Sequence, residues 1–166
     1  MTGIDPRLPN TAASRMPSRP PKAGDLICYR YIWINRNFAR TPKHADKVRP
    51  VLVLHREPLA AGLYQLSLLA ISTKKQREPD KGLAVPHLER QRAGLKEKSW
   101  VVTTGINQVT WPSDLFEPFD PPAGSAGLYA RFSSAFFAHV ARTVSQNIAD
   151  AQAEKERKLK RLMKHG

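Results

Sequence analysis

Apolar residues in the first two thirds of the chain fall in short runs, separated by charged or turn-forming stretches. Short runs that are rich in β-branched and aromatic residues are typical of strands in a compact sheet or barrel. We therefore predict strands at residues 25–34, 48–55, 63–72, 82–86, 99–104 and 106–111. The fold class expected from this pattern is mainly β.

A helical period replaces the strand pattern near Gly127. Apolar side chains then recur at three- and four-residue spacing, at Phe136, Val140, Val144, Ile148 and Ala151. This spacing indicates a helix with one buried stripe, so we predict a helix from about residue 127 to 150 that packs on the sheet. Beyond it the composition stays helical, and Glu154 with Lys158 and Glu156 with Lys160 form favourable pairs four residues apart. We expect a fraying, basic helical end there.

Three regions follow from these patterns. Residues 1–23 mix Pro, Ser and Arg without a hydrophobic period, so we expect a disordered basic tail. Residues 24–150 form one domain, and residues 151–166 form a basic helical extension. Within the domain, residues 36–47 are too polar for a strand and predict a long exposed loop, while the Pro- and Gly-rich residues 112–127 predict an irregular connection.

The charge of the chain favours a polyanionic partner. Lys and Arg outnumber Asp and Glu by 27 to 14, which gives a formal net charge of +13. The excess is not confined to the ends, because residues 25–149 still carry 17 basic against 10 acidic side chains. A basic folded domain is typical of nucleic-acid-binding proteins.

The single cysteine, Cys28, excludes an intramolecular disulfide and a Cys-rich zinc site. The sequence lacks the apolar segment of a signal peptide and any apolar run long enough for a membrane helix. We therefore expect a soluble, cytoplasmic protein. The histidines show no metal-ligand spacing and no Gly-rich phosphate loop is present, so no metal and no cofactor are expected.

Three segments in order resemble the PemK/MazF family of growth-inhibiting toxins: GDLICYRY at 24–31, KVRPVLVL at 47–54 and SLLAISTKK at 67–75. The stretch KSWVVTTGINQVTWP at 98–112 looks like the family's fifth and sixth strands. The resemblance covers residues 24–150 and fits a longer, divergent PemK-like branch. It implies an SH3-like small β-barrel of the PemK/MazF/CcdB type with a C-terminal helix.

The resemblance also implies a site. Arg49 matches the family's catalytic arginine, which stabilises the phosphate that is cleaved; a structural ion pair with Asp25 or Asp46 is the alternative. Ser72 stands at the position of the family's functional Thr, and Thr73 follows it. Their hydroxyls either contact the scissile phosphate or the 2′-OH, or cap the strand and start a turn.

The chain departs from the family at the residues that would accept the proton during cleavage. Many members carry an acidic residue where this chain has His44, and several carry Asp where it has Asn107. An amide cannot accept a proton at neutral pH, so Asn107 removes one candidate base or orienting carboxylate. His44 titrates near neutrality and is a candidate replacement, although a lone loop histidine is more often only solvated.

A basic track accompanies these positions. We expect it to bind RNA phosphates and to stack or hydrogen-bond bases through Arg36, Phe38, Arg40, Lys43, Lys47, Lys74, Lys75, Arg77, Gln108 and Trp111. The alternative is a solubilising charged face. Trp33 and Trp100, on apolar strands, are expected in the core.

The expected function is that of a toxin of a type II toxin–antitoxin pair. The resemblance implies a homodimer that cleaves single-stranded RNA without a metal, through attack of the 2′-OH, and that an acidic antitoxin tail blocks the groove. A non-catalytic nucleic-acid-binding module on the same barrel is the main alternative. A DNA-binding autoregulator, acting on operator DNA with the antitoxin, is a third possibility.

Overall fold

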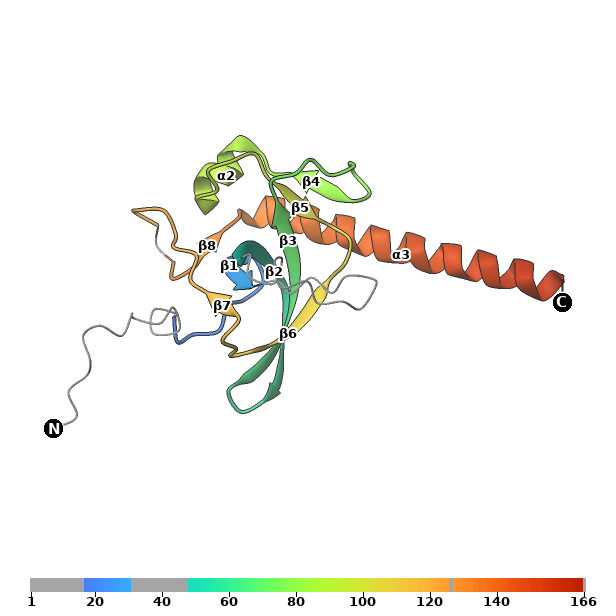
Figure 1. Cartoon of the computed structure of the whole chain (residues 1–166), viewed down its shortest axis with the longest axis horizontal. Helices are drawn as coiled ribbons and strands as arrows, with labels where there is room; N and C mark the ends of the chain where they lie inside the picture. The colour runs from blue at the N-terminus through green and yellow to red at the C-terminus, as the bar shows by residue number, and fades with distance from the viewer. Residues whose placement is uncertain (1–16, 31–47, 126, 166) are drawn as a thin grey trace.

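The structure is a computed structural model that describes residues 17–30, 48–125 and 127–165. In it a curled, eight-stranded sheet carries a long C-terminal helix that extends beyond the body of the molecule (Figure 1). The strands are β1 (Asp25–Arg30), β2 (Val48–Ala60), β3 (Leu63–Ser72), β4 (Gly82–Ala84), β5 (Trp100–Val102), β6 (Asn107–Trp111), β7 (Phe116–Glu117) and β8 (Ala130–Arg131). The helices are α2 (His87–Ala93) and α3 (Ser134–Lys164).

All six predicted strands are present; β3 has the predicted ends, and the others differ at one or both ends. Strand β2 continues to Ala60, five residues beyond the predicted end, because it forms a long hairpin with β3. The predicted residues 31–34 lie outside the described part of the chain. Helix α2 and the two-residue strands β7 and β8 were not predicted, because segments this short carry no hydrophobic period and depend on their neighbours in the fold.

The sheet is antiparallel and runs in the order β4-β5-β3-β2-β1-β7. One edge of β3 is shared by two partners: β6 pairs with its first half, Tyr64 to Leu68, and β5 pairs with its end, Ile71 and Ser72. Strand β1 is covered in the same way by β7 and β8. Both β1 and β3 thus pair with two short strands along one edge, and the sheet is curled (Figure 1).

The two faces of the sheet bury separate clusters of apolar side chains. Leu52 of β2 contributes to the cluster beneath α3, whereas its neighbours Val51 and Val53 contribute to the opposite cluster. This alternation is what a strand buried on both faces requires. The mainly β fold with a C-terminal helix is therefore confirmed.

Helix α3 packs on the sheet through the predicted stripe, but only in its first half. Phe136, Val140 and Val144 are buried, whereas Ile148 is 45% exposed and Ala151 is also exposed. The buried stripe therefore ends at Val144. The Glu154–Lys158 pair forms, with 3.1 Å between Oε1 and Nζ, and the helix continues through the predicted basic extension to Lys164.

The predicted start of this helix at residue 127 is wrong. Residues 130–131 are held in β8 by pairing with β1, and α3 begins only at Ser134. Ser133 is the N-cap, and its hydroxyl accepts a hydrogen bond of 3.2 Å from the backbone N–H of Phe136. A capping serine of this kind marks the first turn, and the apolar period alone does not locate it.

The last residues of the predicted disordered tail lie against the barrel. The Arg56 guanidinium donates a hydrogen bond of 3.1 Å to the carbonyl of Pro20, and the Tyr129 hydroxyl donates to the carbonyl of Arg19. The proline-rich segment has no apolar period, but its carbonyls are acceptors that these two side chains reach. Residues 1–16 lie outside the described part of the chain.

In the part of the chain that the structure describes, the helices are either too short or too polar to span a lipid bilayer.

Candidate functional site

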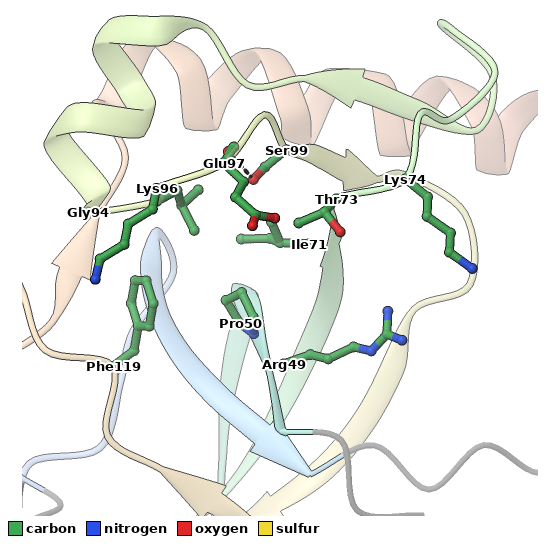
Figure 2. A pocket seen from close by; sticks show the side chains of 11 residues that line it. Arg49, Pro50, Ile71, Thr73, Lys74, Gly94, Lys96, Glu97, Ser99 and Phe119 are labelled. Carbon is green, nitrogen blue, oxygen red and sulfur yellow. Dashed lines mark hydrogen bonds between the residues drawn. The ribbon is translucent and has the colours of Figure 1, made fainter. Parts of the chain in front are cut away.

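The strand topology brings three chain segments to one edge of the sheet. Because β2 and β3 are antiparallel, the start of β2 lies beside the end of β3. Strand β5 is antiparallel to β3 and starts opposite its end, with Trp100 paired to Ser72, so the loop that precedes β5 reaches the same edge. Figure 2 shows the resulting pocket, whose volume is about 450 Å³.

Each of the three segments contributes charged or polar side chains to this pocket. Among the described residues, its lining comprises Arg49, Pro50, Ile71, Thr73, Lys74, Gly94, Leu95, Lys96, Glu97, Ser99 and Phe119. The structure thus brings together Arg49, Thr73 and Lys74, which the sequence analysis had placed in one site from the family resemblance.

Arg49 lies near the start of β2, opposite Tyr29 of β1, and is half-buried. Asp25, one of the two ion-pair partners considered for it, lies at the other end of β1. Its carboxylate binds Arg131 and accepts a hydrogen bond of 2.8 Å from the backbone N–H of Lys22. The acid that was a structural alternative for Arg49 therefore serves another arginine, and Asp46 lies outside the described residues.

The two neighbouring hydroxyls at the end of β3 have different roles. Ser72 accepts a hydrogen bond of 3.1 Å from the backbone N–H of Lys74, which is the turn-capping role considered for this pair. Thr73 lines the pocket beside Lys74. Of these two residues, Thr73 is therefore the one that lines the pocket.

The loop between α2 and β5 supplies pocket residues that the sequence analysis missed. Gly94 ends α2 in the left-handed conformation, with φ 76°, and Leu95 donates a hydrogen bond of 2.9 Å from its N–H to the carbonyl of Arg90. The chain then turns into the pocket with Lys96 and Glu97. Only the helix stop at Gly94 could have been read from the sequence, because the stretch LKEKS has no pattern.

The electrostatic character of the pocket is cationic with one acidic group. Arg49, Lys74 and Lys96 line it, and Glu97 is the only carboxylate among its described lining residues. Figure 2 shows Arg49 and Lys74 on one side of the pocket and Lys96 on the other; a guanidinium can bind a phosphate through a planar fork, and an ammonium group can bind it as a point charge. The residues that the structure describes contain no group of three or more His, Cys, Asp or Glu side chains placed to hold a metal ion.

Asn107 and Gln108 lie at the start of β6 and are not among the described residues that line the pocket. They pair with Leu68 and Ser67 of β3, below the level of the pocket. Gln108 accepts a weak side-chain hydrogen bond of 3.4 Å from Gln65.

Three further predicted RNA-binding residues lie apart from the pocket. Lys75 and Arg77 are exposed on the chain that leaves β3. Arg77 forms an ion pair with Asp80, with 3.8 Å between Nε and Oδ2. Trp111 is only 7% exposed and packs against Phe116, with 5.2 Å between ring centroids. The end of β6 turns its indole into the core, so little of the ring is exposed to stack on a base. Trp100, expected in the core, is half-buried.

The remaining predicted residues lie outside the described part of the chain. They are Arg36, Phe38, Arg40, Lys43, His44 and Lys47, and Trp33 also belongs to this stretch.

Cys28 is held in the protonated form. Burial, together with the carboxylates of Glu117 and Asp120, raises the pKa of the thiol to about 11. A thiol with so high a pKa is a poor nucleophile at neutral pH. Cys28 is therefore a packing residue of β1.

The architecture is that of a curled antiparallel sheet whose strand ends form a cationic pocket and whose C-terminal helix covers one face. Solved structures with the same architecture include MazE–MazF from Deinococcus radiodurans. Its form III is 19% identical, covers 78% of this chain and 96% of that chain, and has a TM-score of 0.50. Form II is 18% identical with the same coverage and a TM-score of 0.48. The form III comparison shows that the chain has the MazF-type fold, which the resemblance of its sequence segments predicted.

No protein-family model matches the chain. No curated protein sequence matches it either.

Proposed function

We propose that this protein is the toxin of a type II toxin–antitoxin pair and that it cleaves single-stranded RNA at the pocket of Figure 2. The observation that carries the proposal is the convergence of Arg49, Thr73 and Lys74 in one pocket of a MazF-type fold. The three residues come from the ends of two antiparallel strands. They combine a planar donor, a hydroxyl and a cation, the groups that a phosphodiester in the transition state requires.

The proposed reaction needs no external nucleophile. The 2′-oxygen of the substrate attacks the neighbouring phosphorus, the bond to the 5′-oxygen breaks, and the products are a 2′,3′-cyclic phosphate and a 5′-hydroxyl. Arg49 offsets the charge that develops on the equatorial oxygens, where a preorganised donor is worth roughly 10²- to 10³-fold in rate. Thr73 donates its hydroxyl to a non-bridging oxygen and thereby orients the phosphate.

The cationic pocket also suits an inhibitory partner. The structural neighbours are complexes of MazF with MazE. By analogy, we infer that a cognate antitoxin with an acidic tail occupies the pocket and that the toxin is a homodimer. Complementary charge would give fast, salt-sensitive association.

The test is RNA cleavage by the purified protein in the presence of EDTA, with the products resolved on a denaturing gel. We expect fragments that end in a 2′,3′-cyclic phosphate, and we expect Arg49→Ala to lower the rate by at least roughly 10²-fold. Arg142→Ala is the matched control, because Arg142 is an exposed arginine of α3 outside both the pocket and the predicted RNA-binding track. Tight RNA binding without products would refute the enzyme and support the non-catalytic binding module.

A further inference from the structure

Among the described residues that line the pocket, one side chain is a carboxylate, a group that can act as a proton acceptor. Glu97 is the only carboxylate among the described lining residues, and Figure 2 shows it directed into the pocket beside Ile71 and Thr73. We propose that Glu97 is the general base that takes the proton from the attacking 2′-hydroxyl. This inference rests on the proposed RNA cleavage at the same pocket, and it answers the absence of a carboxylate at residue 107.

The loop that carries Glu97 is fixed at both ends. At its start, Gly94 and Leu95 complete the hydrogen bonds that close α2. At its end, the buried Ser99 donates its hydroxyl to the carbonyl of Glu97 over 2.8 Å, and the carbonyl of Ser99 accepts the N–H of Val85 at 2.9 Å. A base must stay within hydrogen-bond reach of the proton it removes, so an anchored loop suits this role better than a mobile one.

The charges around Glu97 come from every segment that lines the pocket. Arg49 lies at the start of β2, Lys74 follows β3, and Lys96 precedes Glu97 on its own loop. These cations bind the phosphate, so the substrate would place its ribose next to the only anionic side chain of the described lining.

The step balances without a cofactor. The Glu97 carboxylate takes the 2′-hydroxyl proton while the 2′-oxygen forms its bond to phosphorus. The bond between phosphorus and the 5′-oxygen then breaks, and this oxygen takes up a proton from water. Glu97 returns its proton to water, and the enzyme is restored.

The test compares Glu97→Gln, Glu97→Asp and a control, Glu57→Gln, in single-turnover cleavage at saturating RNA. Glu57 is an exposed glutamate of β2 outside the pocket, so its change to glutamine alters the same charge without touching the site. We expect Glu97→Gln to lower the cleavage rate by roughly 10²- to 10⁴-fold. Glu97→Asp should retain part of the rate, and the RNA affinity of both variants should stay within about three-fold of the wild type, since Glu97 donates no hydrogen bond to phosphate.

Two further readouts separate a base from a merely structural residue. The rise of the cleavage rate with pH on the acidic side should disappear in Glu97→Gln. A substrate with a 5′-bridging sulfur, whose leaving group needs no proton, should not rescue this variant, because the defect lies in the attack and not in the departure.

The outcomes distinguish this inference from the proposed function. If the wild type cleaves RNA and Arg49→Ala does not, but Glu97→Gln cleaves within about three-fold of the wild type, Glu97 is not the base and the toxin proposal stands. If the sulfur substrate rescues Glu97→Gln, the residue acts on the leaving group and the assignment is overturned. If the wild type produces no fragments, both proposals fail.

Discussion

One carboxylate links the helix that precedes the Glu97 loop to the start of the long C-terminal helix. Glu89 of α2 accepts two hydrogen bonds from Ser133, one from its backbone N–H at 2.8 Å and one from its hydroxyl. The same hydroxyl caps α3 by accepting the N–H of Phe136. Replacing Glu89 and Ser133 by alanine, singly and together, should therefore reveal an energetic coupling between the two helices.

The magnitudes follow from the bonds that each change removes. Glu89→Ala loses two hydrogen bonds to a charged acceptor. Because Glu89 is half-buried, we take the lower end of the usual free-energy range for each bond, about 1.5 kcal/mol. The predicted loss of unfolding free energy is therefore about 3 kcal/mol. Ser133→Ala loses one such bond and the cap of α3, about 2.5 kcal/mol together. The double variant loses the shared bond only once, so it should be destabilised by about 4 kcal/mol rather than the additive 5.5 kcal/mol.

The assay is urea unfolding followed by far-ultraviolet circular dichroism, with the free energy of unfolding extrapolated to water for all four proteins. The predicted coupling is about 1.5 kcal/mol, and the slope of the free energy against urea should not change. Glu57→Ala, an exposed carboxylate elsewhere, should stay within about 0.5 kcal/mol of the wild type. Additive effects of the two changes, within about 0.5 kcal/mol, would refute the shared bond.

Three other predictions test the packing of the core, the chemistry of β1 and the role of the extension. Val140 is fully buried, so Val140→Ala should lower the free energy of unfolding by about 2 kcal/mol. Ile148 is 45% exposed, so Ile148→Ala should lower it by well under half as much. Equal losses would contradict the conclusion that the buried stripe of α3 ends at Val144. Because the pKa of Cys28 is raised from 9.0 to about 11, iodoacetamide at pH 8 should modify the folded protein roughly 100-fold more slowly than the urea-unfolded protein, and equal rates would contradict the burial. A chain that ends at Asp150 should melt within about 2 °C of the full chain, since residues 151–165 are exposed; a larger loss, measured by calorimetry, would show that the extension packs on the body.

The strands were predictable because their apolar runs are buried in the sheet. The predicted strand ends also located the part of the pocket that β2 and β3 provide. Arg49 stands at the start of one run and Thr73 just after the end of another. In an antiparallel hairpin these two ends meet, so their proximity follows from topology. Which of Ser72 and Thr73 faces the pocket did not follow, because side chains alternate and a shift of one residue in the end of the strand exchanges their roles.

The acidic side of the pocket could not be predicted in this way. Glu97 lies in a polar stretch, and it reaches the pocket only because α2 and the turn at Gly94 redirect the chain. Helix α2 is seven residues long, too short to show a period in the sequence. The burial of Trp111 was missed for a related reason: at the end of a strand the register with β3, and not the residue type, decides which face an aromatic side chain takes.

These placements change what the amide at residue 107 means. Strands β6 and β5 border the same edge of β3, one at Tyr64 to Leu68 and the other at Ile71 and Ser72. Asn107 pairs with Leu68 on β6 and is not among the described residues that line the pocket, whereas Glu97 reaches the pocket from the chain that leads into β5. An amide at residue 107 therefore removes no proton acceptor from the described lining of this pocket. The absence of an acid at this one position is consequently weak evidence against catalysis, because the pocket is built from several chain segments and one of the others carries a carboxylate.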